Sequence, residues 1–257
     1  MALTFNQAMK YTIPVDNWII EHKILGTKSK MIAWGNEKSF KSMLISIDLA
    51  INLAQGTDWI GFRTKKSRVL IINAELPEEE LAERIQDYGK AHGLSELSGV
   101  YWETTFLKLD RSTDANNLEQ LVKKYKPDVL ILDCLYALAQ GDITRNTTIT
   151  SVILCLDKLI REYGISIILV HHTSKQTFDI FGKPVQRGAD ASYGSAFLQY
   201  WLDSGIGLNR HDKSTNDLIV SFDDLRRTKR PIAPMHLTFN EDRMLFLPKK
   251  DIIVPLE

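Results

Sequence analysis

The sequence has only two cysteines, Cys134 and Cys155, and both lie in apolar stretches without the short spacing that metal-binding cysteines share. This scarcity excludes a disulfide-rich fold and predicts reduced core thiols in a reducing compartment. No stretch approaches the ~18 consecutive apolar residues of a membrane-spanning helix. Residues 1–6 also lack the basic segment and apolar core of a secretion signal. We therefore expect a soluble, cytoplasmic protein with no membrane partner.

An excess of charge is missing as well, because 32 basic residues balance 32 acidic ones. This balance excludes a protein that coats nucleic acid through its overall charge, so any DNA contact must come from a local basic patch. Internal repeats and low-complexity tracts are absent. With 44% hydrophobic content, residues 1–257 are expected to form a single domain.

Short β-rich runs alternate with helical patterns over most of the chain. Strands are predicted near residues 31–34, 68–73, 129–133 and 166–170, and helices near 42–55, 77–92, 115–126 and 147–163. This alternation is typical of an α/β fold with a mostly parallel central sheet flanked by helices. Residues 199–250 predict antiparallel strands that extend one edge of the sheet, and residues 1–30 an N-terminal segment that packs on the core.

The most informative segment is a strand, a loop and a helix at residues 31–55. Its loop and first helical residues are Gly35, Asn36, Glu37, Lys38, Ser39, Phe40, Lys41, Ser42 and Met43. Backbone N–H groups of such a loop can converge on an anion at the positive end of a helix dipole, as in a nucleotide phosphate cradle. Lys41 would then reach the β- and γ-phosphates, and the Ser42 hydroxyl would ligate Mg²⁺. The Walker A pattern G-x-x-x-x-G-K-[ST] is broken at Phe40, and a lysine-rich turn without a ligand is the alternative.

Two carboxylates follow predicted strands. Asp133 ends the strand at 129–133, and ligands of open α/β sheets bind at the carboxyl ends of the strands. Asp133 can therefore hold the water shell of Mg²⁺ opposite Ser42. Glu75 follows the strand at 68–73 and is our candidate for polarising the attacking water. The alternative is that the two acids merely end a strand and begin a helix.

Adjacent histidines, His171 and His172, follow the strand at 166–170. Successive strand side chains face opposite ways, so only one of the two can face a nucleotide. We interpret His172 as a sensor that contacts the γ-phosphate or the catalytic water. A zinc site is the competing interpretation. It is disfavoured because adjacent histidines on a strand do not easily ligate one metal, and no cysteine or third histidine is nearby.

Together, the four motifs resemble those of RecA-fold ATPases, and among these the RepA/DnaB-type replicative helicases of plasmids and phages. The resemblance covers roughly residues 15–248 and is carried by Gly35-x4-Phe40-Lys41-Ser42, Asn-Ala-Glu75-Leu-Pro, Leu-Ile-Leu-Asp133 and Leu-Val-His-His172-Thr-Ser-Lys. It implies a RecA-like P-loop core that uses ATP and Mg²⁺. It further implies a homo-oligomeric ring, commonly a hexamer, with nucleotide at each subunit boundary and single-stranded DNA in the central channel.

The resemblance assigns the cradle and magnesium positions to Lys41, Ser42 and Asp133, the base to Glu75 and the sensor to His172. Members of this family also supply basic residues from a neighbouring subunit to stabilise charge on the transferred phosphoryl group. Four residues of the matching stretch are candidates for this role: Arg226, Arg227, Lys229 and Arg230. A solvated basic turn is the alternative.

The segment at residues 173–190 is the candidate DNA-binding region. It interleaves cations with aromatic rings, namely Lys175, Phe178, Phe181, Lys183 and Arg187. This combination suits sequence-tolerant binding of single strands. The segment directly follows the predicted sensor strand, so the nucleotide state can move it. An ordinary surface loop, with Arg187 at a subunit contact, is the alternative.

The sequence thus favours an ATP-driven helicase or translocase that acts on single-stranded DNA in replication. Three alternatives remain open: a RecA-fold recombination or annealing ATPase that forms filaments, a KaiC-like signalling ATPase without a nucleic-acid role, and a nucleotide-binding loader or adaptor. The last has little turnover, and Phe40 lends it weight.

Overall fold

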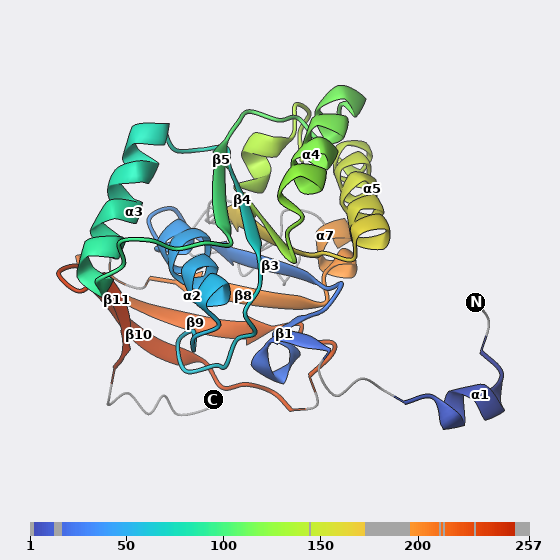
Figure 1. Ribbon diagram of the computed structural model, residues 1–257, viewed down its shortest axis with the longest axis horizontal. Helices are drawn as coiled ribbons and strands as arrows, with labels where there is room; N and C mark the ends of the chain where they lie inside the picture. Colours follow the sequence, from blue (N-terminus) through green and yellow to red (C-terminus); the bar gives the residue numbers. More distant parts are fainter. Residues whose placement is uncertain are drawn as a thin grey trace, which may run out of the picture.

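The structure is a computed structural model, and it describes residues 3–12, 17–143, 145–172, 196–210, 212, 214–228 and 230–249. A nine-stranded sheet with the order β11-β10-β9-β8-β3-β7-β6-β4-β5 forms its centre, and helices cover both faces (Figure 1). Among the described residues, no helix is both long and apolar enough to cross a bilayer.

The parallel part of the sheet contains β3 (Lys30–Gly35), β4 (Val69–Asn73), β5 (Val100–Thr104), β6 (Val129–Asp133), β7 (Ser166–His172) and β8 (Ser204–Asn209). The central strands are apolar throughout because each faces a core on both sides. Met31 and Ala33, for example, pack into one core and Ile32 into the other. The predicted α/β class, with a mostly parallel sheet and antiparallel C-terminal strands, is confirmed.

The antiparallel part consists of β9 (Asp217–Asp223), β10 (Met235–Asn240) and β11 (Leu245–Pro248). It begins one strand later than predicted, because β8 runs parallel to β3 and only its other edge pairs with β9 in the antiparallel sense. The expected start of β8 at Trp201 is also wrong. Trp201 ends the short helix α7 (Ala196–Trp201), so the strand begins at Ser204.

The helices that flank the sheet are α2 (Ala50–Gln55), α3 (Glu78–His92), α4 (Ser112–Tyr125) and α5 (Asn146–Tyr163), close to their predicted bounds. Three of them end at a glycine in the left-handed conformation, which terminates a helix without steric penalty: Gly56, Gly93 and Gly164. The first half of the helix predicted at 42–55 is π-helical, from Ser42 to Leu49. Such wide turns are rare and often lie beside functional sites.

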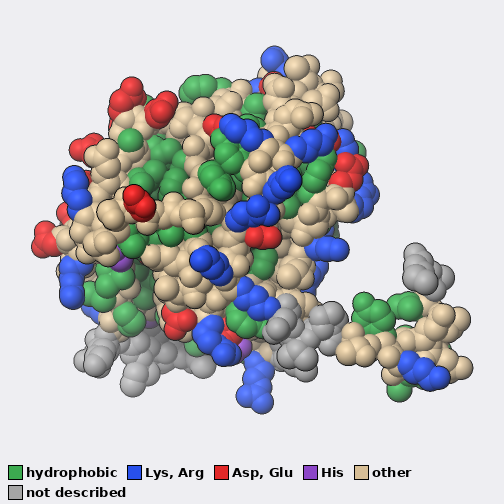
Figure 2. Space-filling model, viewed as in Figure 1, with side chains coloured by type: hydrophobic (Ala, Val, Ile, Leu, Met, Phe, Trp, Pro, Cys, Tyr) green, Lys and Arg blue, Asp and Glu red, His purple; other side chains and the backbone are tan. Residues whose placement is uncertain are grey.

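The N-terminal segment is only partly packed on the core. Strands β1 (Trp18–Ile20) and β2 (Leu25–Gly26) form a small antiparallel sheet with buried isoleucine and leucine side chains. Helix α1 (Phe5–Lys10), in contrast, buries no side chain, and Phe5 is 79% exposed. Figure 2 shows α1 apart from the main body with hydrophobic side chains on its surface. The expectation that residues 1–30 pack on the core is therefore wrong for residues 3–12, where a capping box at Thr4 holds the helix by local bonds alone.

A buried polar network joins the π-helix to α3. Asp48 accepts hydrogen bonds from the Tyr88 hydroxyl (2.8 Å) and from Asn52 (3.3 Å), and the Tyr88 ring stacks on His92. Burial raises the pKa of Asp48 to about 6, and these hydrogen bonds oppose the shift only in part. The carboxyl group is therefore a titratable element in an otherwise apolar core.

We expect the Asp48→Asn substitution to change how stability depends on pH. The pKa of Asp48 rises on folding from 3.8 to about 6. Asp48 is therefore protonated in both states at low pH, and its ionisation destabilises the folded state as the pH rises through this window. The penalty is complete above about pH 6 and amounts to roughly 3 kcal/mol at most. Asparagine keeps an acceptor for Tyr88 but carries no charge.

Urea unfolding of both proteins between pH 4 and pH 8 tests this prediction. The free energy of unfolding of Asp48→Asn should rise relative to the unsubstituted protein as the pH increases. A constant difference between the two proteins across this range would show that Asp48 does not titrate in the folded state.

Candidate functional site

The four sequence motifs meet at the carboxyl edge of four adjacent strands, β3, β7, β6 and β4. The register fixes this meeting, because Gly35 lies opposite His172, and Asp133 lies between Val170 and Asn73. The ends of parallel strands share one edge of a sheet, where open α/β sheets bind their ligands. The site is therefore assembled by strand pairing rather than by residues close in the chain.

The loop between β3 and the π-helix has the backbone of an anion-binding turn. Lys38 and Phe40 are both left-handed, with φ of 60°, whereas Ser39 and Lys41 are not. Alternation of this kind can turn successive N–H groups toward one side, which creates an anion-binding concavity. The Ser39 hydroxyl donates to the Asn36 carbonyl (2.7 Å) and holds the loop closed. The loop therefore fits a phosphate group.

The Lys41 side chain is buried inside this loop. Its ammonium group donates to the carbonyls of Gly35 (2.9 Å) and Asn36 (2.5 Å). Burial lowers the pKa of Lys41 to about 8, while the charges of Asp133 and Glu75 oppose the shift. The structure thus brings together the lysine and the two carboxylates that the sequence predicted for one site.

Asp133 lies buried at the end of β6 and faces the start of the π-helix. Its Oδ2 atom accepts a hydrogen bond from the Ser46 hydroxyl (2.7 Å). Burial raises the pKa of Asp133, and the hydroxyls of Ser46 and Ser42 oppose this rise. A carboxylate and two hydroxyls are hard oxygen donors of the kind that Mg²⁺ prefers, so these residues fit the expected ion. Sequence reasoning missed Ser46, although its spacing of four from Ser42 places both on one helix face.

The turn that carries Glu75 is held by Asn73 at the end of β4. The Asn73 Oδ1 atom accepts from the Leu76 backbone N–H (3.0 Å), and its Nδ2 atom donates to the Leu76 carbonyl (2.7 Å). Asparagine favours such turns because its side chain mimics a backbone peptide group. Asn73 is therefore a positioning residue that sequence reasoning did not single out.

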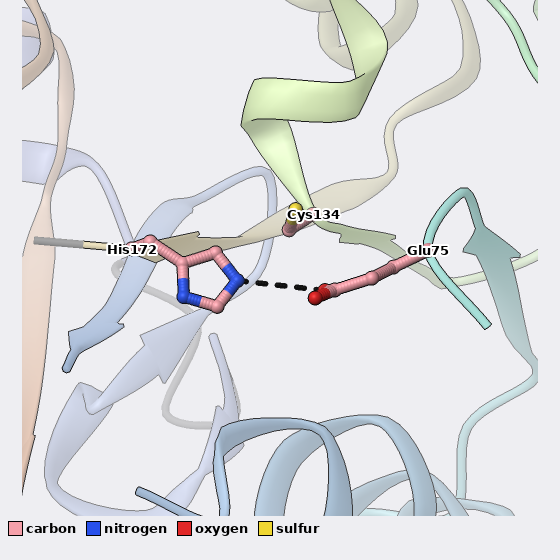
Figure 3. A group of neighbouring side chains, drawn as sticks. All are labelled: Glu75, Cys134 and His172. Atoms are coloured by element: carbon pink, nitrogen blue, oxygen red, sulfur yellow. Dashed lines mark hydrogen bonds and ion pairs between the residues drawn. The ribbon is translucent and has the colours of Figure 1, made fainter. Parts of the chain in front are cut away.

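Glu75 and His172 point toward one another across the strand edge (Figure 3). The His172 Nε2 atom lies 3.4 Å from Glu75 Oε2, whereas the ring of His171 is buried on the other side of the strand. The hydrogen bond from His172 holds the pKa of Glu75 below its usual value, and partial burial opposes this shift. Glu75 is thus an ionised carboxylate whose side chain is 44% exposed to solvent.

Cys134 completes this group. Its sulfur lies near the Glu75 carboxylate and the His172 ring, and one ligand-type atom from each residue lies within 4.8 Å of the other two (Figure 3). The expectation that no cysteine lies near the histidines is therefore wrong. Cys134 and His172 are far apart in the sequence, and only the pairing of β6 with β7 brings them together.

Phe40 occupies the position where the phosphate-loop pattern has glycine. Its ring packs against Phe239 and Phe246, with centroid distances of 5.1 and 6.2 Å, and the Arg210 guanidinium lies 4.7 Å from the ring centroid. Arg210 also donates to the carbonyl of Lys38 in the loop (3.1 Å). Contacts with β10, β11 and the end of β8 therefore hold a phenylalanine in a conformation that usually requires glycine.

The remaining predicted residues do not join this site. Arg226 and Arg227 follow β9, whose end pairs with the beginning of β8, so they lie at the opposite edge of the parallel strands. Arg230 is an exposed residue of the same connection. Six candidates lie outside the described residues: Lys229, Lys175, Phe178, Phe181, Lys183 and Arg187.

A mostly parallel sheet with a lysine-containing phosphate loop and an aspartate at the next-but-one strand end defines the RecA-like P-loop ATPase fold. A model of the AAA domain family (AAA_25) matches residues 1–177, and the chain belongs to this family. The family match and the fold confirm the resemblance to RecA-fold ATPases that the motifs predicted.

Solved structures show the same fold. The ATPase domain of a DnaB-like helicase superposes with a TM-score of 0.63 at 13% identity, covering 87% of this chain and 86% of that domain. A KaiC-like protein from Pyrococcus horikoshii superposes with a TM-score of 0.62 at 14% identity, covering 93% of this chain and 96% of its own. No curated protein matches the chain.

Substitutions of Phe40 test the backbone conformation of the loop. Phe40→Gly and Phe40→Ala both remove the ring contacts, but only alanine retains a Cβ atom in the left-handed conformation. We expect Phe40→Ala to be less stable than Phe40→Gly by about 1 kcal/mol. Denaturant unfolding of the two variants measures this difference. Equal stability of both, or a more stable alanine variant, would show that residue 40 is not left-handed in the folded protein.

Proposed function

We propose that the chain hydrolyses Mg-ATP and uses the energy as a replicative helicase or translocase on single-stranded DNA. The observation that supports this most directly is the convergence of Lys41, Asp133 and Glu75 at one strand edge next to the anion-binding loop. The family supports the coarser part of the proposal, an ATPase. The DNA-dependent part comes from the motifs and from the fold that the chain shares with the ATPase domain of the DnaB-like helicase.

Phosphate binding falls to the loop from Gly35 to Ser42. Its N–H groups donate to phosphate oxygens, and Lys41 exchanges its present bonds to loop carbonyls for bonds to the β- and γ-phosphates. Ser42 and Asp133 hold Mg²⁺, with Ser46 orienting the aspartate. When bound, Mg²⁺ neutralises charge on the phosphates.

Glu75 is the proposed general base. Its carboxylate is ionised and half-exposed, so it can accept a proton from a water molecule at the open strand edge. Asn73 fixes the turn from which Glu75 projects. His172 shares a hydrogen bond with the same carboxylate and directly precedes the candidate DNA segment, so a change at the base reaches that segment through one residue.

A second subunit is part of this proposal. Arg226 donates to the carbonyls of Gln199 and Tyr200, and Arg227 forms an ion pair with Asp203 (2.9 Å), so both have partners within their own subunit. Arg230 is exposed, and the described residues provide it with no hydrogen bond or ion pair. It lies at the strand edge opposite the phosphate loop, so it can serve only a neighbouring site. Arg230 is therefore our preferred trans-acting residue in a homo-oligomeric ring, which we propose to be a hexamer.

A KaiC-like signalling ATPase without a nucleic-acid role is the second candidate. The chain matches a KaiC-like structure over nearly the full length of both proteins, so the fold favours neither candidate. A filament-forming recombination ATPase remains the third. The DNA proposal rests on Lys175, Phe178, Phe181, Lys183 and Arg187, and DNA-dependent activity separates these classes.

Substitution of the proposed base tests the chemistry. Glu75→Gln should bind ATP but hydrolyse it at least about 100-fold more slowly, because an amide cannot accept the proton. Lys41→Ala should abolish hydrolysis by weakening phosphate binding. Phosphate release and nucleotide binding are measured for each variant. The matched control is Glu78→Gln, which changes an exposed carboxylate in the first turn of α3 and should hydrolyse ATP normally. Equal hydrolysis by Glu75→Gln and the unsubstituted protein would refute the assignment of the base.

Single-stranded DNA should stimulate hydrolysis if the chain is a motor. We expect the paired Lys175→Ala and Lys183→Ala substitutions to remove the stimulation but keep the basal rate, because they remove phosphate contacts only. Lys90→Ala, which changes an exposed lysine on α3, is the control and should retain stimulation. Hydrolysis rates with and without DNA, with a mass measurement of the ATP-bound assembly, provide the test. Absence of stimulation in a ring-forming protein would favour the signalling class.

A further inference from the structure

We propose that Glu75, Cys134 and His172 form a binding site for Zn²⁺ or a similarly thiophilic divalent ion, and that the bound ion inhibits hydrolysis. The inhibition rests on the proposed role of Glu75, whereas the binding does not. The three residues are the only group of at least three possible metal ligands that the described residues bring together.

The spacing of the group fits one tetrahedral ion. Two nitrogen or oxygen ligands about 2.0–2.1 Å from zinc lie roughly 3.4 Å apart at the tetrahedral angle, and a sulfur ligand lies slightly farther from each. The observed distance between His172 Nε2 and Glu75 Oε2 is 3.4 Å, and the three ligand atoms all lie within 4.8 Å of one another. Small side-chain rotations therefore suffice to bring all three onto one ion.

The donor set selects the kind of metal. One thiolate, one imidazole and one carboxylate suit zinc, and soft sulfur donors are poor ligands for Mg²⁺. The oxygen donors Asp133 and Ser42 belong to the neighbouring magnesium position and leave this set intact. Two different ions can therefore be distinguished by their donors, although Asp133 and Cys134 are adjacent in the chain.

The position of the group leaves one coordination site for water. Cys134 is 3% exposed and forms the floor, while the side chains of Glu75 and His172 are 44% and 29% exposed and form the open side. Three strand-end segments supply the ligands, after β4, at β6 and at β7, so the sheet holds the site in place. An ion can enter from solvent past Glu75 and His172 without any opening of the core.

Occupation of this site removes two groups from the proposed reaction. Ligation uses the Glu75 oxygen that would accept a proton from water. It also uses the His172 nitrogen that contacts Glu75, so the connection from the base to the segment beyond β7 is interrupted. Lys41 and its loop do not contribute ligands. ATP binding should therefore persist while hydrolysis stops.

Cobalt substitution tests the binding on its own. Co²⁺ added to the metal-free protein should give a thiolate-to-cobalt charge-transfer band and the visible bands of a tetrahedral ion, at one equivalent, and Zn²⁺ should displace them. Cys134→Ser should lose the charge-transfer band and bind Zn²⁺ at least about tenfold more weakly, since even outer-shell partners contribute ~10–100-fold. Cys155→Ser, which changes the other free thiol, is the matched control and should behave as the unsubstituted protein.

Zinc titration of hydrolysis at saturating Mg-ATP tests the inhibition. Each protein is compared with its own zinc-free rate, and the concentration for half inhibition should rise at least about tenfold in Cys134→Ser but not in Cys155→Ser. A charge-transfer band that survives in Cys134→Ser, or no band in the unsubstituted protein, would overturn the site. A tight, Cys134-dependent zinc site with unchanged hydrolysis would overturn the inhibition and would also count against Glu75 as the base. Failure of cobalt to bind leaves the Glu75→Gln result as a separate test of the proposed function.

Discussion

The buried ammonium group of Lys41 is the interaction on which the site depends. Burying a cation is unfavourable unless opposite charge and hydrogen-bond acceptors surround it. Here the acceptors are carbonyls of the loop itself, and the opposing charges come from Asp133 and Glu75 at the ends of two other strands. The loop, β6 and β4 are thereby linked through one side chain. An anion that approaches the loop finds a desolvated cation, which strengthens their attraction.

Phe40 shows how the surrounding fold accommodates a departure from the phosphate-loop pattern. A left-handed phenylalanine is strained, and the strain is offset by ring contacts with the C-terminal strands and by the Arg210 guanidinium. The antiparallel extension therefore has a role beyond completing the sheet. It supports the loop whose N–H groups face the ligand, so the shape of the phosphate site depends on residues from both ends of the chain.

Much of the fold followed from local patterns. Runs such as Val129–Asp133 are apolar on both faces, which specifies a central parallel strand, and the polar residue after each run marked the site edge. Strand β5 escaped prediction because it is an edge strand with only Val100 fully buried, so its pattern is weak. The π-helical turns after Ser42 and the exposed helix α1 also have no clear periodic signature. The contacts of Cys134 with His172 and of Phe40 with Phe239 depend on strand order and register, which single-sequence patterns do not encode.

A structure of the protein with Mg²⁺ and a non-hydrolysable ATP analogue tests the central claim most directly. The account predicts that Lys41 leaves the carbonyls of Gly35 and Asn36 and lies about 3 Å from β- and γ-phosphate oxygens. The Glu75 carboxylate should then face the terminal phosphate, with Asp133 and Ser42 beside the metal ion. An analogue bound elsewhere, or a Lys41 side chain still bonded to its own loop, would contradict the account.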